Sequence, residues 1–176
     1  MAIAFLLSGS NEGDRAGYLQ SAATYLRKDA GELLACSNVY ESASWGFDHP
    51  SPFLNQAIKL KTSLGPEELL KVLHRIEALC GRDRTGDDEY SARTLDIDIL
   101  FFDELVMESQ ELTLPHPRLH LRRFALKPLA EIASDHTHPL FDKSIGQLLE
   151  ECSDDGVVMK FRECRSCYKK EEGNEI

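Results

Sequence analysis

Two aspartates separated by one residue stand in segment 93–102, which has the apolar composition of a strand. Because side chains alternate along a strand, Asp96 and Asp98 are predicted to project from one face, with Ile97 and Ile99 on the other. Same-face neighbours lie roughly 6.5 to 7 Å apart, and carboxylate oxygens suit Mg²⁺. The pair is therefore a candidate ligand set for two magnesium ions about 3.5 to 4 Å apart.

An isolated Asp-x-Asp pair more often faces solvent on a one-sided sheet, so its neighbours matter. Leu100 and Phe102 are expected to continue the face of the aspartates, and Phe101 the opposite face. The carboxylates would then lie at the end of a partly covered surface, where unpaired charge is costly. This context favours a functional pair.

Arginines gather on both sides of the aspartates in an otherwise acidic chain. The formal net charge of −10 argues against a general binder of nucleic acid or anionic membranes. Cations beside magnesium-binding carboxylates suit a polyphosphate, because phosphoryl-type transfer depends mainly on alignment and charge neutralisation. No P-loop pattern occurs, so a nucleotide would bind in another architecture. The two clusters are Arg82, Arg84 and Arg93, and Arg118, Arg122 and Arg123.

The elements that must position these residues follow from apolar periodicity and turn residues. Their order, strand, helix, strand, strand, helix, strand, predicts an α+β fold. We expect a ferredoxin-like sandwich, with a mainly antiparallel sheet and helices packed on its faces. The expected strands are 3–7, 33–40, 53–62 and 93–102, and the expected helices are one from near Asn11 or Glu12 to Gly31, then 66–79, 124–132 and 145–149.

A chain of 176 residues with 42% hydrophobic content is expected to form one domain, residues 1–160. Residues 161–176 are expected to be a partly disordered C-terminal tail. The opening apolar run is too short for a signal or membrane helix. The five cysteines form an odd set without disulfide-framework spacing, which favours a reducing, cytoplasmic location. Cys164-x-x-Cys167 is a poor zinc candidate, because a closed site needs four ligands.

Several separated motifs together resemble the hydroxymethyldihydropterin pyrophosphokinase family. They occur in the family's order, and the similarity covers the chain from about Ile3 to Pro139. The resemblance implies transfer of pyrophosphate from ATP to 6-hydroxymethyl-7,8-dihydropterin in folate biosynthesis, with AMP leaving. The motifs are Gly9-Ser10-Asn11, Gly81-Arg82-x-Arg84, Arg93-Thr94-Leu95-Asp96-Ile97-Asp98-Ile99-Leu100, Pro115-His116-Pro117 and Arg122-x-Phe124.

The resemblance also implies a role for individual residues. Asp96 and Asp98 would hold two magnesium ions, and Arg82 and Arg93 would act with them in catalysis by contacting the phosphates. Glu77 is expected to orient an arginine. The implied ATP-binding residues are Leu70, His74, Glu77, Arg82, Arg84, Arg93, Ile99, Thr113, His116 and Arg122, with Leu70 and Ile99 bordering the adenine. The implied pterin-binding residues are Ser42, Ala43, Trp45, Gly46, Phe53, Asn55 and Phe124, with Phe53 and Phe124 sandwiching the ring and Asn55 reading its polar edge.

Three positions depart from the family pattern. Glu111 stands where some members have an arginine, His74 where glutamine is frequent, and Tyr90 where a tryptophan can occur. The expected partners are ATP and the pterin, with no nucleic acid and no membrane, and the chain is expected to be a monomer.

Two other functions are compatible with the aspartate pair. In a two-metal nuclease or phosphodiesterase, Asp96 and Asp98 would activate water. A non-catalytic module would bind the nucleotide without turnover. Either phenylalanine alone would more often be core packing. Phe53, Asn55 and Phe124 together favour the pyrophosphokinase, since a hydrolase has no need for a pterin slot.

Overall fold

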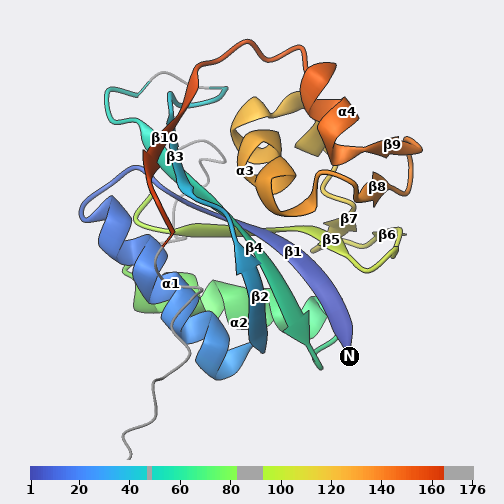
Figure 1. Ribbon diagram of the computed structural model, residues 1–176. Helices are drawn as coiled ribbons and strands as arrows, with labels where there is room; N and C mark the ends of the chain where they lie inside the picture. The colour runs from blue at the N-terminus through green and yellow to red at the C-terminus, as the bar shows by residue number, and fades with distance from the viewer. Residues whose placement is uncertain (47–48, 83–92, 165–176) are drawn as a thin grey trace, which may run out of the picture.

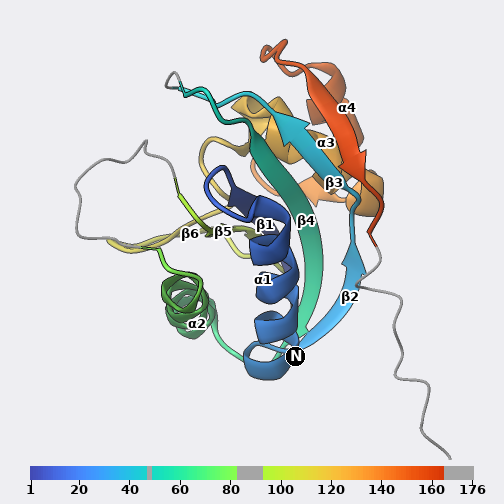
Figure 2. The same ribbon diagram turned by 90° about the vertical axis from the view of Figure 1, so that its left-hand side faces the viewer.

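A computed structural model describes residues 1–46, 49–82 and 93–164. In this part of the chain, a six-stranded sheet separates two layers of helices (Figures 1 and 2). The path through the sheet is β10-β3-β4-β1-β5, with β2 also paired to β4, and every pairing is antiparallel. The strands are β1 (Ala2–Ser10), β2 (Glu32–Cys36), β3 (Val39–Ser42), β4 (Phe53–Thr62), β5 (Asp96–Phe102) and β10 (Val158–Arg162).

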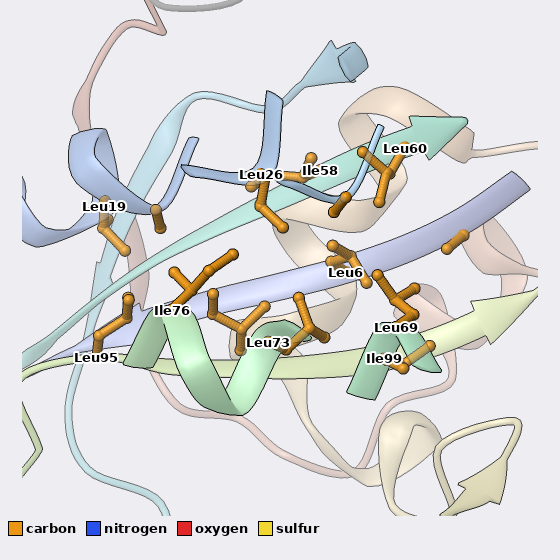
Figure 3. Close-up of a cluster of buried hydrophobic side chains, with 14 of the residues drawn as sticks. Leu6, Leu19, Leu26, Ile58, Leu60, Leu69, Leu73, Ile76, Leu95 and Ile99 are labelled. Atoms are coloured by element: carbon orange, nitrogen blue, oxygen red, sulfur yellow. The ribbon is translucent and has the colours of Figure 1, made fainter. Parts of the chain in front are cut away.

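The helices cover both faces, which confirms the predicted sandwich (Figure 2). On one face, α1 (Arg15–Asp29) and α2 (Pro66–Leu79) pack over a core that includes Leu6, Leu26 and Leu73 (Figure 3). On the other, α3 (Arg123–Ala133) and α4 (Ile145–Glu150) cover a second core. The remaining elements are η1 (Leu119–Leu121) and two short hairpins, β6 (Met107–Glu108) with β7 (Thr113–Leu114) and β8 (Thr137–His138) with β9 (Lys143–Ser144).

Local sequence explains most helix and strand ends. The helix expected from near Asn11 or Glu12 begins at Arg15, because Asp14 caps it by accepting the Gly17 N–H at 3.0 Å. The expected strand 33–40 is interrupted between β2 and β3. There the Ser37 hydroxyl accepts the Ala57 N–H at 2.9 Å, in place of a regular ladder bond.

A bulge in β5 changes the expected face of two phenylalanines. The register with β1 shifts so that Leu6 pairs with Ile99 and Phe5 with Phe101, which leaves Leu100 as the extra residue. Phe101 therefore joins Leu100 in the core under α3, and Phe102 returns to the core under α2. The predicted faces of Phe101 and Phe102 were wrong. Those of the two aspartates, before the bulge, are unaffected.

The C-terminal segment adds structure that the sequence did not predict. β10 pairs with β3 and forms the edge of the sheet, so the expected boundary after residue 160 falls inside this strand. The rest of the expected tail, residues 165–176, lies outside the described residues, as does Cys167.

The cysteines also differ from the expectation. Cys80 and Cys152 are free thiols, whereas Cys36 is disulfide-bonded, which its spacing did not predict. Within the described ranges, no group of three or more His, Cys, Asp or Glu side chains could hold a metal. None of the described helices is both long and apolar enough to cross a membrane.

Candidate active site

Three residues lie in a row across the centre of the sheet, one on each of three neighbouring strands. Gly9 of β1 pairs with Asn55 of β4 on one side and with Asp96 of β5 on the other. Directly opposed residues of antiparallel strands share a face, so all three belong to the face covered by α3. With strands about 4.8 Å apart, Asn55 and Asp96 lie roughly 10 Å from each other.

Gly9 keeps the space between these side chains open. A Cβ atom at this position would lie 3.1 Å from Asn55 Oδ1 and 3.9 Å from Phe53 Cδ1. Asn55 is 2% exposed, and its Nδ2 donates to the Ser42 hydroxyl at 3.1 Å. Two of the predicted pterin-binding residues, Asn55 near the start of β4 and Ser42 at the end of β3, are therefore in contact.

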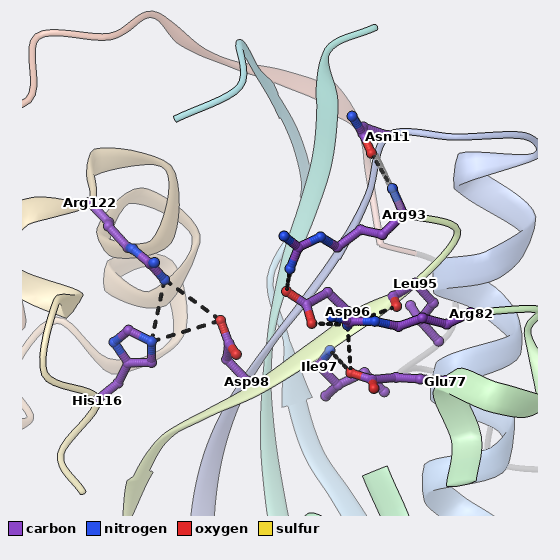
Figure 4. Close-up of polar contacts among 10 residues, drawn as sticks. All are labelled: Asn11, Glu77, Arg82, Arg93, Leu95, Asp96, Ile97, Asp98, His116 and Arg122. Carbon is purple, nitrogen blue, oxygen red and sulfur yellow. Dashed lines mark hydrogen bonds and ion pairs between the residues drawn. The ribbon is translucent and has the colours of Figure 1, made fainter. Parts of the chain in front are cut away.

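Two arginines hold the carboxylate of Asp96 (Figure 4). Arg82 contacts Asp96 Oδ1, and Arg93 Nη1 donates to Oδ2 at 2.6 Å. Burial alone would raise the pKa of Asp96, but the guanidinium groups of Arg93 and Arg82 outweigh it and hold that pKa below its usual range. Asp96 is therefore ionised and neutralised by cations from both sides.

Glu77 fixes one of these arginines from beneath the sheet. Its buried Oε1 atom accepts the Ile97 N–H at 2.8 Å and Arg82 Nη1 at 3.2 Å (Figure 4). The predicted contact between Glu77 and an arginine is present. The same carboxylate joins α2 to the strand that carries both aspartates.

Asp98 projects from the same face as Asp96, as predicted, toward a different group of residues (Figure 4). Its Oδ2 atom lies 3.7 Å from Arg122 Nη1 and 3.9 Å from His116 Nε2. Burial, together with the neighbouring charge of Asp96, raises the pKa of Asp98 to about 7. The charged form is therefore less favoured at Asp98 than at Asp96.

His116 is neutral at pH 7. Burial and the charges of Arg122 and Arg118 lower its pKa to about 4. Its Nδ1 accepts the Arg118 N–H at 3.2 Å, and its Nε2 lies 3.3 Å from Arg122 Nη1. The contact between His116 and Asp98 is therefore not an ion pair at this pH, and Arg122 supplies the positive charge.

The start of α3 brings aromatic side chains to the same place. The Arg122 guanidinium lies 5.0 Å from the ring centre of Trp45 and 5.7 Å from that of Phe124. The two rings are 6.3 Å apart and tilted by 54°. Arg122 therefore contacts Asp98 on one side and lies near two flat, apolar rings.

Sequence comparison assigns this arrangement to a family. Residues 5–134 match the family model for 7,8-dihydro-6-hydroxymethylpterin-pyrophosphokinase (HPPK). The chain belongs to this family. It is 42% identical over 131 residues to 2-amino-4-hydroxy-6-hydroxymethyldihydropteridine pyrophosphokinase of Bacillus subtilis (strain 168), covering 74% of this chain and 77% of the relative. The enzyme of the same name from Aquifex aeolicus (strain VF5) is 38% identical over 151 residues, which cover 86% of this chain and 92% of the relative.

Solved structures agree on the fold. A Plasmodium falciparum HPPK-DHPS triple mutant with STZ-DHP superimposes with a TM-score of 0.70 at 17% identity, covering 85% of this chain and 43% of that one. Another HPPK-DHPS, crystallised in complex with substrates, gives 0.68 at 15% identity, with the same coverage of both chains. The chain is thus an enzyme of the HPPK family, a pyrophosphokinase, with the fold of HPPK domains.

Four of the residues that the HPPK resemblance assigns to ATP, two of them (Leu70 and Ile99) to the adenine, lie on β5 or on elements beside it. Leu70 and His74 lie on α2, and Thr113 lies on β7. Ile99 is buried in the core under α2, on the face opposite Asp98, and Leu70 packs against that core. An adenine contact for these side chains stays a prediction.

Some predicted residues are less enclosed or lie outside the described residues. Ala43 and Gly46 are exposed in the loop after β3, and Glu111 is exposed before β7. Arg84 and Tyr90 lie outside the described residues, so no position is given for either.

Asn11 is a site residue that the sequence-based assignment of roles missed. It is 1% exposed, and its Oδ1 accepts the Arg93 N–H at 2.8 Å while its Nδ2 lies 3.2 Å from His49 Nδ1. It therefore joins the loop of Trp45 to the arginine that holds Asp96. Its place after a strand, in the motif Gly9-Ser10-Asn11, was the available signal.

Proposed function

We propose that this enzyme transfers the pyrophosphoryl group of ATP to 6-hydroxymethyl-7,8-dihydropterin in folate biosynthesis. The products are AMP and 6-hydroxymethyl-7,8-dihydropterin diphosphate. The observation that carries this proposal is the row Asn55, Gly9 and Asp96. It places a buried amide, able to read a heterocycle, across one intervening strand from a carboxylate held by arginines.

The donor set suits magnesium. Mg²⁺ takes one or two protein carboxylates and completes its coordination with water and phosphate. Asp96 and Asp98 share a face, and a divalent cation bound there would neutralise the charge of both carboxylates. We assign both as ligands of two ions, which when bound would neutralise charge on the phosphates.

The arginines would change partners when ATP binds. Arg82 and Arg93 contact both oxygens of Asp96, and charge-assisted bonds to phosphate have the same geometry as those to carboxylate. We propose that both turn from Asp96 to the phosphates, with Glu77 holding Arg82 in reach. This exchange would leave Asp96 available as a ligand.

The reaction requires an in-line arrangement at the β-phosphorus. The hydroxymethyl oxygen of the pterin would form the new P–O bond, and the bond to the oxygen of the α-phosphate would break, so that AMP leaves. We assign Phe53, Phe124 and Asn55 to hold the pterin ring in line. The backbone of 42–46 would supply further hydrogen bonds, because an unpaired buried polar group discriminates against a wrong heterocycle.

The nucleotide would lie beside β5. We assign Leu70, His74, Ile99 and Thr113 to the adenine end. The phosphate end would take the remaining predicted ATP-binding residues, which are Glu77, Arg82, Arg84, Arg93, His116 and Arg122. We further propose a monomer without nucleic-acid or membrane partners, located in the cytoplasm where ATP is available.

A coupled assay tests the function. The protein is incubated with ATP, magnesium and 6-hydroxymethyl-7,8-dihydropterin, and AMP is measured. Asp96→Ala and Asp98→Ala are expected to abolish turnover, while the exposed control Asp135→Ala keeps it. Wild-type rates in both site variants would refute the assignment.

The same assay separates the alternatives. Release of phosphate from a nucleic acid or phosphodiester without the pterin would indicate a two-metal hydrolase. ATP binding without AMP formation would indicate a nucleotide-binding module.

A further inference from the structure

Asp154 lies outside residues 5–134, the part of the chain that matches the HPPK family model. Its side chain nevertheless reaches the helix that carries site residues. Oδ2 accepts the N–H of Arg123 at 2.9 Å, across 31 residues of sequence. Oδ1 accepts the Gly156 N–H at 2.9 Å, which fixes the carboxylate within its own turn.

Helix α3 needs such an acceptor because its own N-cap residue cannot provide one. The N-cap position is Arg122, which makes no side-chain cap hydrogen bond, and a guanidinium has only donors. The first N–H groups of a helix have no partner within it. Asp154 satisfies the first of them and places a carboxylate at the positive end of the helix.

The capped residue stands between two residues of the proposed site. Arg122 contacts Asp98, His116 and the Trp45 ring, and Phe124 packs beside Trp45. The backbone of the residue between Arg122 and Phe124 determines where both side chains point. A change in the position of Arg123 would therefore move a cation and an aromatic ring together.

Asp154 is itself held from both directions along the chain. Cys152, two residues earlier, packs against the core under α3 and α4. Val158, four residues later, begins β10 and pairs with Ser42 of β3. The segment between α4 and β10 thus passes the start of α3 and is attached to the fold on both sides of Asp154.

We propose that Asp154 is a positioning residue for the pyrophosphokinase reaction. It caps α3 from the C-terminal segment and so holds Phe124 in the position that binds the pterin ring, with Arg122 beside it at the phosphate end of the site. It acts through the backbone of Arg123 and touches no reacting atom. This inference rests on the proposed function, because its readout is pterin binding.

The test is steady-state AMP formation by the full chain, with the pterin and ATP varied separately and the melting temperature measured alongside. In Asp154→Ala, the KM for the pterin is expected to rise about three- to tenfold, with kcat within about twofold of wild type. Asp154→Asn, whose amide oxygen can still accept the Arg123 N–H, is expected to restore the pterin KM to within about twofold. The neighbouring exposed Asp155→Ala removes the same charge and serves as the matched control.

Each outcome bears on a separate claim. If Asp154→Ala and Asp155→Ala have the same KM for the pterin, the cap is purely structural and the inference is overturned. This holds even if Asp154→Ala has the lower melting temperature. If Asp154→Asn has as high a KM for the pterin as Asp154→Ala, the hydrogen bond to the Arg123 N–H is not the cause of the effect. If Asp154→Ala does not fold, Asp154→Glu, which displaces the carboxylate by one methylene, must raise the pterin KM. Absence of AMP formation by the wild type would refute the proposed function instead.

Discussion

At the scale of single residues, the candidate site depends on the absence of a side chain at Gly9 as well as on the side chains around it. Gly9 separates Asn55 from Asp96 by the width of one strand, and no other residue type leaves that face open. The groups assigned to the pterin and those assigned to the phosphates can then share one surface. A ligand that contacts both must pass over Gly9.

Gly9→Ala tests this reading. The new methyl group would lie 3.1 Å from Asn55 Oδ1, so the amide has to move from its present position. Overpacking of this kind costs about 1–3 kcal/mol, and we expect the KM for the pterin to rise at least about tenfold while that for ATP stays within about twofold. Steady-state kinetics with each substrate varied provides the measurement.

Gly65→Ala is the matched control for this substitution. At that position the nearest atom to a new Cβ is Glu68 Oε2 at 3.5 Å, an ordinary contact, and neither residue is assigned to the pterin. Equal pterin KM values for the two variants would contradict the role given to Gly9.

A second residue-scale prediction concerns Glu77, whose buried carboxylate serves two donors. Glu77→Gln can keep the bond from Ile97 N–H through its amide oxygen but loses the charge that faces Arg82. We expect unfolding free energy to fall by about 1–3 kcal/mol, since Arg82 keeps Asp96 as a partner. Urea denaturation measures this, with exposed Glu67→Gln in the same helix as control. If Glu77→Gln loses no more unfolding free energy than Glu67→Gln, Asp96 alone is a sufficient partner for the charge of Arg82.

At this scale, strand alternation correctly predicted that the two aspartates share a face. Asp96 and Asp98 share a face because the strand before the bulge is regular. The sequence could not show that both Arg82 and Arg93 turn to Asp96, since long side chains choose partners by three-dimensional proximity. Nor could it find Asp154, an aspartate in a polar segment whose partner is 31 residues away.

At the scale of elements, the main predicted strands and helices are present, and the exceptions have local causes. Periodicity found β4 and α2 with their observed bounds. It could not find the bulge at Leu100, because apolar residues fill both faces of β5 after Asp98. β10 was missed because its side chains are mostly exposed, and edge pairing leaves little hydrophobic pattern.

One contact joins α3 to the sheet and gives an element-scale prediction. The Tyr40 hydroxyl of β3 donates to Glu131 Oε2 of α3 at 2.8 Å. Burial and Glu131 raise the pKa of Tyr40 to about 12, so the hydroxyl remains a donor at every pH where the protein is used. Tyr40→Phe is expected to lower the free energy of unfolding by about 1–2 kcal/mol.

Urea denaturation checks this value, with Tyr25→Phe in α1 as the comparison for losing a half-buried hydroxyl. A double-mutant cycle with Glu131→Gln would isolate the pairwise coupling. Coupling close to zero would mean that the Tyr40 hydroxyl does not help to hold α3 against β3.

At the scale of the whole molecule, one sheet is covered by two cores, and the site lies where the second core ends. Leu7, Ala57 and Leu100 continue under α3 the same sheet face that Gly9, Asn55 and Asp96 form. Stability of that core and geometry of the site are therefore linked through α3. Conditions that loosen the second core should affect the enzyme before the first core responds.

Low pH is such a condition, because His138 lies at the edge of the second core and its side chain is buried, with 2% exposed. Its ring stacks on Phe141 at 4.4 Å and meets Phe101 edge-on at 5.2 Å, and Nδ1 accepts the Leu140 N–H at 3.2 Å. Burial, with smaller contributions from His120 and His136, lowers its pKa to about 4. Protonation of Nδ1 would remove the bond from Leu140.

The sign of the pH dependence follows from this shift. The unfolded chain binds the proton near pH 6.5, whereas the native protein binds it only near pH 4. Between these values the unfolded state carries more protons, so His138 makes the unfolding free energy fall as pH decreases, by up to about 1.4 kcal/mol per pH unit. Its stabilising contribution is fully present above pH 6.5.

His138→Asn, which keeps an acceptor but does not titrate, is expected to be less stable at pH 7 and to lose stability less steeply between pH 6.5 and 4. Urea denaturation at several pH values gives both slopes, and contributions from carboxylates and from His116, whose pKa is also near 4, cancel in the difference. If the unfolding free energies of wild type and variant change with pH at the same rate, protonation of His138 does not destabilise the native protein. The acid sensitivity of the second core would then have to come from other groups.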